Sequence, residues 1–323
     1  MNFTPEALLQ LSSLRAHFLN AREGLADYWV SEELLALYDA TFAERIGWKW
    51  NFVIEDLERR AYALPEGALV DWGCDTGIAS RKVLQSSIAS FIRNVWLYDR
   101  STLSLDFASK KLARLFPHCR FAQGDTLDGT TLLISHVLNE LSNDDVARLL
   151  HRLRRATCVV WIEPSQKEIA SRLINVREAL RDEFQLVAPC VHQAQCGMLT
   201  PENARHWCHH FAKPPEEAFT ESKWAKFSSA LSIDLRDLSL SYLILDKRPI
   251  PPPALHAKRL IGNLRLYKAS ASLLLCGEES LCEVELTKRD FPEVFKSFKK
   301  GKRPSLPAVT AQEGRVKTWS EAT

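Results

Sequence analysis

Three cysteines lie close together in the middle of the sequence, among histidines and aromatic residues. They are Cys190 and Cys196 in APCVHQAQC and Cys208 in WCHHF. Thiolates bind Zn²⁺ or iron–sulfur clusters, and a closed centre of either kind takes four protein ligands. Prolines and a glycine interrupt regular structure around them, and Trp207 and Phe211 are placed to shield a site. We therefore predict a metal centre whose fourth ligand lies elsewhere.

The fourth ligand has several candidates. Cys282 alternates in phase with Val284 and Leu286, so it is interpreted as a core residue of a strand. Cys276 ends a strand beside Gly277, and we favour it as the ligand. The other candidates are His192, His206, His209 and His210, and spacing alone leaves zinc and an iron–sulfur cluster both open. The remaining cysteines, Cys74, Cys119 and Cys158, are predicted to be core residues.

A second constellation is the segment VDWGCDTG, with Asp71, Gly73, Asp75 and Gly77. It follows an apolar strand and precedes a helix, which is where a nucleotide-like cofactor contacts the edge of a sheet. The pattern GxGxxG is absent, so a pyrophosphate cradle is not expected. The pattern Asp-x-Gly-x-x-x-Gly instead predicts S-adenosylmethionine. Asp75 adds a Cβ and a charge where many methyltransferases carry glycine.

Three further polar residues follow later strands. Asp99 ends the second strand, where a carboxylate can accept hydrogen bonds from both ribose hydroxyls. Asp125 follows the third strand and is predicted to contact the adenine amino group. Ser135 opens SHVLNEL, which lines the reaction centre in this kind of fold, and we place it among the cofactor-binding residues. His136 and Asn139 lie in the same segment, but no dedicated base is identifiable, so the catalytic residues are unknown.

Alternating strands and helices position these residues. Strands are predicted at 68–73, 94–99, 119–122, 130–135 and 157–163. Helices between and after them are expected to begin at Ser101, at Ser142 and at a capping box formed by Ser165 and Glu168; Ser31 is a further predicted N-cap. Such alternation predicts parallel strands joined by right-handed crossovers, hence a doubly wound α/β sheet. Strands at 185–189 and 240–246 are expected to complete it.

The composition excludes several classes of protein. The chain has 323 residues, 46% of them hydrophobic, and a formal net charge of +2, so no global field favours nucleic acid or membranes. No apolar run approaches the ~20 residues needed to span a bilayer, and the N-terminus lacks a secretory signal. We therefore expect an intracellular protein, in which grouped cysteines indicate metal or catalysis rather than disulfides.

The chain is predicted to have three parts. Residues 1–62 are acidic and carry apolar residues at helical spacing, so they are expected to form a helical region. Residues 63–247 form the α/β domain, with a Cys/His-rich insert at about 189–235. After the extended linker PIPPP, residues 248–323 form a basic, β-rich module with a flexible tail.

The stretch 288–303 of this module carries seven basic residues against two acidic ones: Lys288, Arg289, Lys296, Lys299, Lys300, Lys302 and Arg303. Such density neutralises phosphates and gives salt-dependent binding to nucleic acid. Phe291, Phe295 and Phe298 lie between them and would then stack on bases, with Arg259 and Arg265 extending the basic surface. The alternative is a solvated basic helix whose phenylalanines face a core.

The motifs resemble those of the small-ribosomal-subunit-associated methyltransferase-like family, which includes mitochondrial ribosome assembly factors and bacterial relatives. DWGCDTGIAS, YDRS, SHVLNEL, VVWIEPS, APCVHQAQC, WCHHF and SYLILD occur in the family's order, over most of residues 25–290. The resemblance implies a Rossmann-like class I methyltransferase fold that binds S-adenosylmethionine. It also implies a [4Fe-4S] cluster held by Cys190, Cys196, Cys208 and Cys276, and a role at the small ribosomal subunit and its rRNA.

Three functions remain open from the sequence. The first is a cofactor-binding, cluster-bearing protein that acts on small-subunit rRNA in ribosome assembly or translation, with methyl transfer possible. The second is a non-catalytic assembly factor that uses the methyltransferase fold as a scaffold and the cluster as a sensor of iron status. The third is a zinc-stabilised small-molecule methyltransferase. We expect a monomer without membrane contacts, in the cytoplasm of a bacterium or the mitochondrial matrix of a eukaryote.

Overall fold

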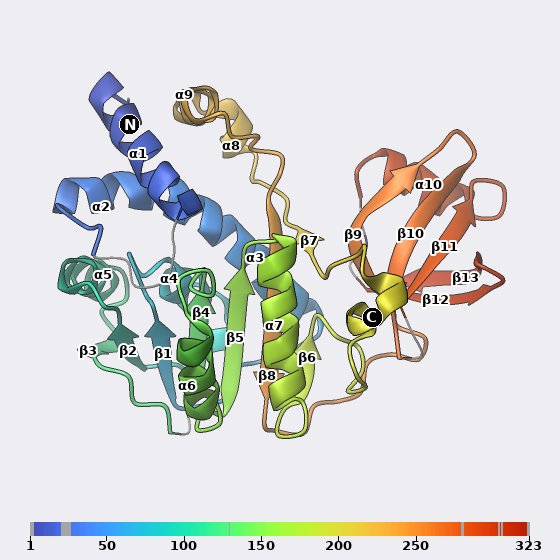
Figure 1. Cartoon of the computed structure of the whole chain (residues 1–323), viewed down its shortest axis with the longest axis horizontal. Helices are drawn as coiled ribbons and strands as arrows, with labels where there is room; N and C mark the ends of the chain where they lie inside the picture. The colour runs from blue at the N-terminus through green and yellow to red at the C-terminus, as the bar shows by residue number, and fades with distance from the viewer. Residues whose placement is uncertain are drawn as a thin grey trace. The chain divides into compact units, whose positions relative to one another are not determined.

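The computed structural model describes residues 3–20, 27–128, 130–278, 281–302, 304 and 306–321 (Figure 1). These residues form two compact units, and each unit combines two separate stretches of chain. The first unit is built from residues 1–163 and 212–240, and the second from 164–211 and 241–323. Among the described residues, no helix is both long and apolar enough to cross a membrane.

Five parallel strands form the centre of the first unit. They are β1 (Ala68–Trp72), β2 (Asn94–Tyr98), β3 (Arg120–Gln123), β4 (Thr131–Ser135) and β5 (Cys158–Glu163), in the order β3-β2-β1-β4-β5. The predicted strands are thus confirmed to within one or two residues. Most residues of β1, β4 and β5 are buried, as expected for parallel strands covered on both faces.

Helices flank these strands, with α6 on the near face and α3 on the far face in Figure 1. The helices of the first unit are α1 (Pro5–Asn20), α2 (Glu32–Tyr38), the π-helix η1 (Asp39–Ala43), α3 (Glu44–Arg59), α4 (Ile78–Leu84), the 3-10 turn η2 (Ser87–Ala89), α5 (Thr102–Leu115), α6 (Asn143–Leu153), α8 (Glu217–Thr220) and α9 (Ser222–Leu231). Ser31, Ser101 and Ser142 cap α2, α5 and α6 as predicted, because each side chain accepts a hydrogen bond from a backbone N–H of the first turn.

The N-terminal helices pack against α4 and α5 through an apolar cluster and a buried ion pair. The cluster contains Trp29, Leu35 and Tyr38, and it reaches Ile78 at the start of α4. The carboxylate of Asp39 accepts hydrogen bonds from Arg81 on α4 and Lys111 on α5. Separating these partners would leave a buried charge without compensation, so the contacts are costly to break. They therefore hold the N-terminal helices in place beside the loop that follows β1.

The second unit begins with α7 (Lys167–Leu180) and contains an antiparallel pair, β6 (Gln185–Ala188) and β8 (Ser239–Asp246). Between them lie the turns η3 (Gly197–Leu199) and η4 (Pro201–Asn203) and the short strand β7 (His210–Phe211), which pairs with β8. The predicted capping box before α7 is wrong. The helix begins after Gln166, and the Ser165 carbonyl accepts a hydrogen bond from the Trp207 indole at 2.7 Å.

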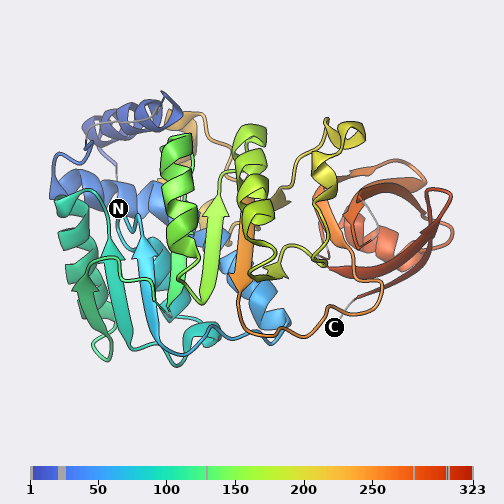
Figure 2. The same ribbon diagram turned by 60° about the horizontal axis from the view of Figure 1, so that its bottom comes forward.

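The rest of the second unit is a five-stranded sheet with one helix. Its elements are β9 (Arg259–Leu266), β10 (Ser270–Cys276), β11 (Leu281–Thr287), α10 (Pro292–Lys299), β12 (Pro307–Gln312) and β13 (Arg315–Glu321), and the strand order is β12-β13-β11-β10-β9. A bridge between Ala257 and Ala308 joins the two ends of this order. The sheet therefore closes on itself, and in Figure 2 the orange and red strands curve round into a ring.

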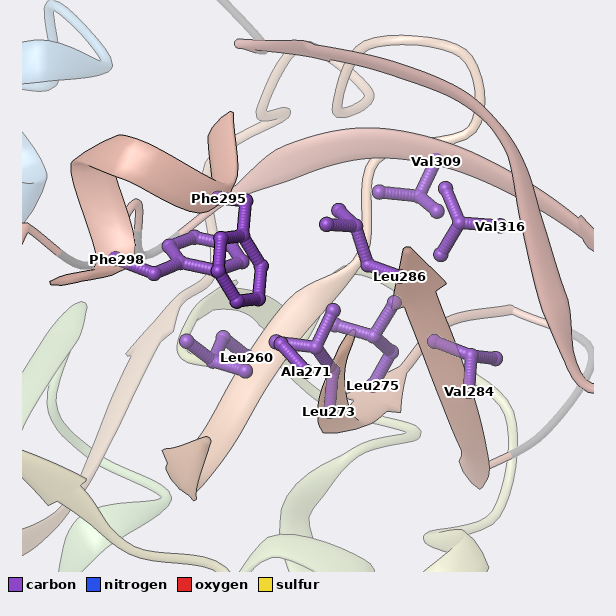
Figure 3. Packing of buried hydrophobic residues seen from close by; sticks show 10 residues of the cluster. All are labelled: Leu260, Ala271, Leu273, Leu275, Val284, Leu286, Phe295, Phe298, Val309 and Val316. Atoms are coloured by element: carbon purple, nitrogen blue, oxygen red, sulfur yellow. The ribbon is translucent and has the colours of Figure 1, made fainter. Parts of the chain in front are cut away.

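An apolar core fills this barrel (Figure 3). It contains Leu273, Leu275, Val284 and Leu286 from the strands, together with Phe295 and Phe298 from α10. Phe295 and Phe298 are buried, so the hypothesis that they stack on bases is wrong, and the alternative of a helix packed on a core holds. Arg259 is also buried, and it donates a hydrogen bond to the Pro189 carbonyl at 2.9 Å. It therefore does not extend the exposed basic surface. Arg303 lies outside the described residues.

The end of the chain differs from the prediction of a flexible tail. Strands β12 and β13 pair antiparallel there, with Val309 and Val316 buried in the barrel core. The Trp319 ring lies 5.6 Å from that of Phe298. The structure also divides the predicted insert, since residues 189–211 belong to the second unit and residues 212–235 to the first. Neither of the predicted domain boundaries, at residues 62 and 247, falls where the chain passes from one unit to the other.

We expect Phe298→Ala to lower the free energy of unfolding by about 3–5 kcal/mol, because it removes a buried ring and leaves a cavity. Urea denaturation followed by circular dichroism measures this loss. The matched control is Lys299→Ala on the exposed face of the same helix, which should change stability by less than about 0.5 kcal/mol. Equal effects of the two substitutions would contradict the assignment of Phe298 to the core.

Candidate cofactor pocket and cysteine site

The loop after β1 is held close to β2 and α5 by its two glycines. Gly73 donates a backbone hydrogen bond to the Tyr98 carbonyl at 2.7 Å. Its φ is 71° and that of Gly77 is 74°, a region that favours glycine. A Cβ at Gly73 would lie 2.7 Å from Val137, and one at Gly77 would lie 2.9 Å from Leu112 of α5. The chain therefore needs glycine at both positions.

Asp71 holds the helix that follows this loop. Its carboxylate accepts hydrogen bonds from the Ser80 amide at 3.1 Å and the Ser80 hydroxyl at 2.6 Å. Its other oxygen is buried and has no partner among the described residues. Burial raises the pKa of Asp71 to about 7, although the Ser80 hydrogen bonds oppose this shift. The contacts present thus orient α4 with respect to β1.

Asp75 and Asp99 are brought together at the end of β2. The Asp99 carboxylate accepts hydrogen bonds from the backbone amides of Asp75 at 2.9 Å and Ser101 at 3.0 Å. Asp75 has a φ of 51°, which a non-glycine residue adopts at a cost. Burial raises the pKa of both carboxyl groups, and the Asp99 charge raises that of Asp75 further. Each proton that these groups hold reduces their mutual repulsion.

Aromatic residues of the N-terminal region face these carboxylates. Burial and the charge of Asp75 raise the pKa of Tyr38 well above its usual value. The pKa of Tyr28 is raised by burial and by the charges of Asp75, Glu140 and Asp99, and the Arg100 guanidinium lies 5.5 Å from its ring centroid. The sequence analysis missed these tyrosines. Tyr38 showed only as one apolar position in a helical pattern.

Asp125 pairs with a cation on α6. Its carboxylate accepts a hydrogen bond from the Arg152 guanidinium, which also donates to the Asp125 carbonyl at 3.4 Å. Gly124 before it has a φ of 139° and lies against the Trp96 ring. The predicted contact with adenine would therefore compete with, or share, the ion pair to Arg152.

Polar groups also gather where β4 and β5 end. The Ser135 hydroxyl accepts a hydrogen bond from the Trp50 indole at 3.1 Å. Glu163 accepts from the amides of Val137 and Leu138 and from the Trp161 indole. Its second oxygen is buried without a partner among the described residues, as are His136 Nε2 and Asn139 Oδ1.

Lys49 of α3 contributes a further charge to this region. Burial lowers its pKa to about 7, Arg45 adds to the shift, and Glu163 opposes it. Burial raises the pKa of Glu163 to about 7. It lowers that of His136 well below the usual range, with the charges of Lys49 and Arg45 as further causes. Sequence reasoning missed Glu163, although a charged residue at the end of the apolar run VVWI was a signal. Lys49 gave none.

The second unit brings together the four cysteines that were predicted to be ligands. Cys196, Cys208 and Cys276 share an apolar cluster with Ile174, Met198, Ile261, Leu274 and Leu281. Cys190, Cys196 and Cys208 line one cavity of about 30 Å³. Burial raises the pKa of the Cys208 thiol well above its usual value, and the charges of Cys190, Cys196 and Cys276 raise it further.

Arg177 of α7 is a cation that lies beside these thiols. Its Nε lies 3.3 Å from Cys190 Sγ, and its Nη2 donates to the carbonyls of His192 and Ala194. Two histidines also approach thiols: His192 Nε2 is 3.7 Å from Cys276 Sγ, and His210 Nε2 is 3.8 Å from Cys208 Sγ. Within the described part of the chain, no three side chains of His, Cys, Asp or Glu are placed to hold a single metal ion.

The other cysteines serve as packing residues. Cys74, Cys119 and Cys158 are buried, which confirms the prediction that they lie in the core. Cys282 packs against the barrel core opposite Leu275, as its alternation with Val284 and Leu286 predicted. Cys276, on the neighbouring strand, faces the thiol cluster instead.

Parallel strands in the order β3-β2-β1-β4-β5, followed by an antiparallel pair of late strands, define a Rossmann-like class I methyltransferase fold. Residues 71–303 match the family model described as "Mitochondrial small ribosomal subunit Rsm22". The chain therefore belongs to this family, and the resemblance seen in the sequence motifs is confirmed.

Solved structures of methyltransferases are also similar to this chain. Magnesium protoporphyrin IX methyltransferase from Synechocystis PCC 6803 is 12% identical with a TM-score of 0.39, over 73% of this chain and 93% of that one. TrmK from M. capricolum is 9% identical with a TM-score of 0.34, over 62% of this chain and 67% of that one. No curated protein sequence matches the chain.

We expect Asp71→Asn to weaken the pH dependence of stability. A carboxyl group whose pKa rises from 3.8 unfolded to about 7 folded stabilises the fold at low pH. That contribution is lost as pH rises from about 4 through about 7. Urea unfolding at pH 5 and pH 8 should therefore show a smaller fall in stability for the variant than for the native chain.

The control for this prediction is Asp128→Asn. Asp128 is an exposed carboxylate paired with Arg155, and its pKa is lowered rather than raised. This variant should keep the native fall in stability between pH 5 and pH 8. An unchanged fall in Asp71→Asn would show that Asp71 does not hold its proton in the folded state.

Proposed function

We propose that this chain binds S-adenosylmethionine and a [4Fe-4S] cluster and acts on the small ribosomal subunit and its rRNA, in ribosome assembly or translation. The observation that carries the proposal is the junction of β1 and β2, where two left-handed glycines bring the backbone close to the half-buried Asp99 carboxylate. Membership of the small-subunit family supports the ribosomal part. The location would be the mitochondrial matrix of a eukaryote or the cytoplasm of a bacterium.

The residues at the ends of β1 and β2 fit the proposed cofactor. A carboxylate has about four lone-pair sites, so Asp99 can keep its hydrogen bonds to Asp75 and Ser101 and still accept from ribose hydroxyls. Asp75 was the residue least suited to a cofactor that carries its own carboxylate. Because burial and Asp99 raise its pKa, Asp75 would hold a proton and donate to that carboxylate rather than repel it.

S-adenosylmethionine would supply an electrophilic methyl group on a sulfonium. The chain's contribution to a transfer would be alignment and exclusion of water, since the methyl group needs no proton to move. The groups at the ends of β4 and β5 suit an acceptor: His136 is held neutral beside Lys49 and Arg45, and its Nε2 is unpartnered among the described residues. The neutral Nε2 of His136 could thus accept a hydrogen bond from an amine or hydroxyl acceptor and orient it.

The donor set of the cysteine site fits an iron–sulfur cluster. Cys196, Cys208 and Cys276 share one apolar cluster, and Cys190 lines a common cavity with Cys196 and Cys208. Cluster ligation by four thiolates adds negative charge, which the Arg177 guanidinium beside Cys190 would offset. The cluster would join Cys190, Cys196 and Cys208 to Cys276 at the end of β10, and so tie the loop region before β7 to the barrel.

A non-catalytic assembly factor is the second candidate. It is favoured by Tyr28 and Tyr38, whose pKa values are raised by the charge of Asp75, and by the hydrogen bond that the Asp75 amide donates to Asp99. These contacts stabilise the loop after β1 without a bound molecule, as a scaffold would require.

Anaerobically purified chain, labelled S-adenosylmethionine and isolated immature small subunits distinguish the two candidates. Label in the rRNA establishes methyl transfer. Binding of cofactor and subunit without label in the rRNA establishes the scaffold role. Failure to bind the subunit overturns the proposal in both forms. Iron and acid-labile sulfide analysis of the same preparation tests the cluster, and zinc without sulfide would assign the site to zinc.

We expect Asp99→Ala to weaken S-adenosylmethionine binding at least about tenfold, because hydrogen bonds to a charged group are worth about 1.5–3 kcal/mol each. Isothermal titration calorimetry measures the dissociation constant. Asp106→Ala is the control, because Asp106 is an exposed carboxylate on α5 that contacts Gln123. Native affinity in Asp99→Ala, with the variant folded by circular dichroism, would remove Asp99 from the cofactor site.

We expect Cys196→Ser to lose the iron–sulfur absorbance near 400 nm and most of its iron, since a missing thiolate opens the coordination shell. Cys119→Ser is the matched control, because Cys119 is also buried but lies in the first unit beside the Ile92 carbonyl. Its iron content should equal that of the native chain. Full iron content in Cys196→Ser would remove Cys196 from the ligand set.

A further inference from the structure

The barrel of the second unit has the connectivity of an oligonucleotide-binding fold. Three antiparallel strands, β9 to β11, are followed by α10 and then by β12 and β13. β13 pairs parallel with β11, and the bridge between Ala257 and Ala308 closes the ring. A five-stranded Greek-key barrel of this kind binds oligonucleotides on the face of its second and third strands. A fold alone does not establish a function, so the surface itself must carry the chemistry.

Other residues of this chain cover part of that face. The second and third strands here are β10 and β11. Leu274 and Cys276 of β10 and Leu281 of β11 pack on the cluster that contains Cys196 and Met198. Glu283 of β11 pairs with Arg205 at 3.0 Å. Side chains of the chain itself thus occupy the part of the face nearest the thiols.

The rest of the face carries Ser272 and Glu285, and cations lie on the strands to either side of it. Arg265 of β9, Ser272 of β10, Glu285 of β11 and Arg315 of β13 are partners in register across four strands. Because neighbours in register point to the same side of a sheet, the two arginines flank the glutamate on the outer surface. Both arginines are exposed.

The adjoining loops extend this row. The backbone amide of Lys288, after β11, donates to the Ala269 carbonyl in the loop between β9 and β10 at 2.8 Å. This hydrogen bond brings Tyr267 and Lys268 of one loop beside Lys288 and Arg289 of the other. We call these residues the basic end of the barrel: Arg265, Tyr267, Lys268, Lys288, Arg289 and Arg315.

The charges of the basic end are available to a ligand. Carboxylates near these five cations are Glu283, Glu285 and Asp290. Glu283 is engaged by Arg205 and by the Ser272 hydroxyl at 3.0 Å each, and Asp290 is engaged by the Thr287 hydroxyl at 2.7 Å. None of the five cations forms an ion pair with another described residue. Unpaired exposed lysines and arginines at this density suit the phosphates of a nucleic acid.

Tyr267 adds a surface on which a base can stack. It is 55% exposed, whereas Phe295 and Phe298 are buried in the barrel core. An exposed ring among cations is the arrangement that binds single strands, because a base must be unstacked to lie on the ring. Double-stranded RNA offers no free base face, so a single strand fits this surface better.

We propose that the basic end binds single-stranded RNA, with a base stacked on Tyr267 and the flanking phosphates held by Lys268, Lys288, Arg289 and the two arginines of the row. This inference deepens the proposed function and rests on it for one point, that the RNA belongs to the small ribosomal subunit. It places the contact on the barrel of the second unit, whereas the residues proposed to hold S-adenosylmethionine belong to the first unit.

The test uses the full chain and a fluorescein-labelled single-stranded oligouridine of about 12 nucleotides, within the site size of one such barrel. Fluorescence anisotropy gives the dissociation constant. We expect Tyr267→Ala to weaken binding about tenfold or more, and Tyr267→Phe to keep it within about twofold because the ring remains. Binding of a duplex RNA of equal length as tightly as the single strand would overturn the proposal.

The charge contribution is tested with a double variant, Lys288→Ala with Arg289→Ala. It should lower the slope of log Kd against log salt by about 1.4, at about 0.7 per phosphate contact of a single strand. The matched control, Lys296→Ala with Lys299→Ala, removes the same charge from α10 and should keep the native slope. An equal loss in both double variants would show diffuse attraction and overturn the location.

Two measurements separate this inference from the proposed function. Tyr267→Ala should retain native iron content and S-adenosylmethionine affinity, and circular dichroism should show a native fold because Tyr267 is exposed. A native chain that binds small subunits but not the oligonucleotide overturns this inference and leaves the proposed function standing. A native chain that binds the oligonucleotide but not subunits overturns the ribosomal role and leaves the RNA surface.

Discussion

Burial of negative charge where the parallel strands end is the constraint on which the first unit depends. Asp71, Asp75, Asp99 and Glu163 all lie in surroundings that raise their pKa values. Ionised carboxylates are costly to bury, and the chain offsets the cost with backbone amides, hydroxyls and indoles rather than with cations alone. The same hydrogen bonds fix the loop after β1 and the segment after β4. Polar groups thus arranged before any ligand arrives suit a cofactor that carries several hydroxyls and charges.

The second unit depends on apolar contacts that cover one surface of its barrel. Its barrel has one surface that must be covered, and the residues around Cys196 and Met198 cover it. The thiols therefore lie between a barrel face and irregular loops, with Cys196 buried and Cys190, Cys208 and Cys276 half-buried. The exposed remainder of the outer surface carries the unpaired cations, so an apolar site and a basic one lie on the same side of one sheet.

The sequence predicted what depends on short-range pattern. The parallel strands, the serine caps and the core cysteines follow from local periodicity and capping chemistry. Ser165 misled because its backbone carbonyl is bound by Trp207, a contact no local pattern reveals. The β12–β13 hairpin was missed because polar residues outnumber its few buried ones, Val309 and Val316 among them. Tyr28, Tyr38 and Lys49 escaped notice because only the tertiary fold brings them to the strand ends.

The covered barrel face has a consequence for dissecting this chain. Residues 248–323 look like an independent module in sequence, and their strands do close into a barrel. A fragment that begins at residue 248 would lack the residues that cover Ile261, Leu274 and Leu281. The apolar patch exposed in this way would promote aggregation. A fragment meant to isolate the barrel should therefore carry residues 164–211 as well.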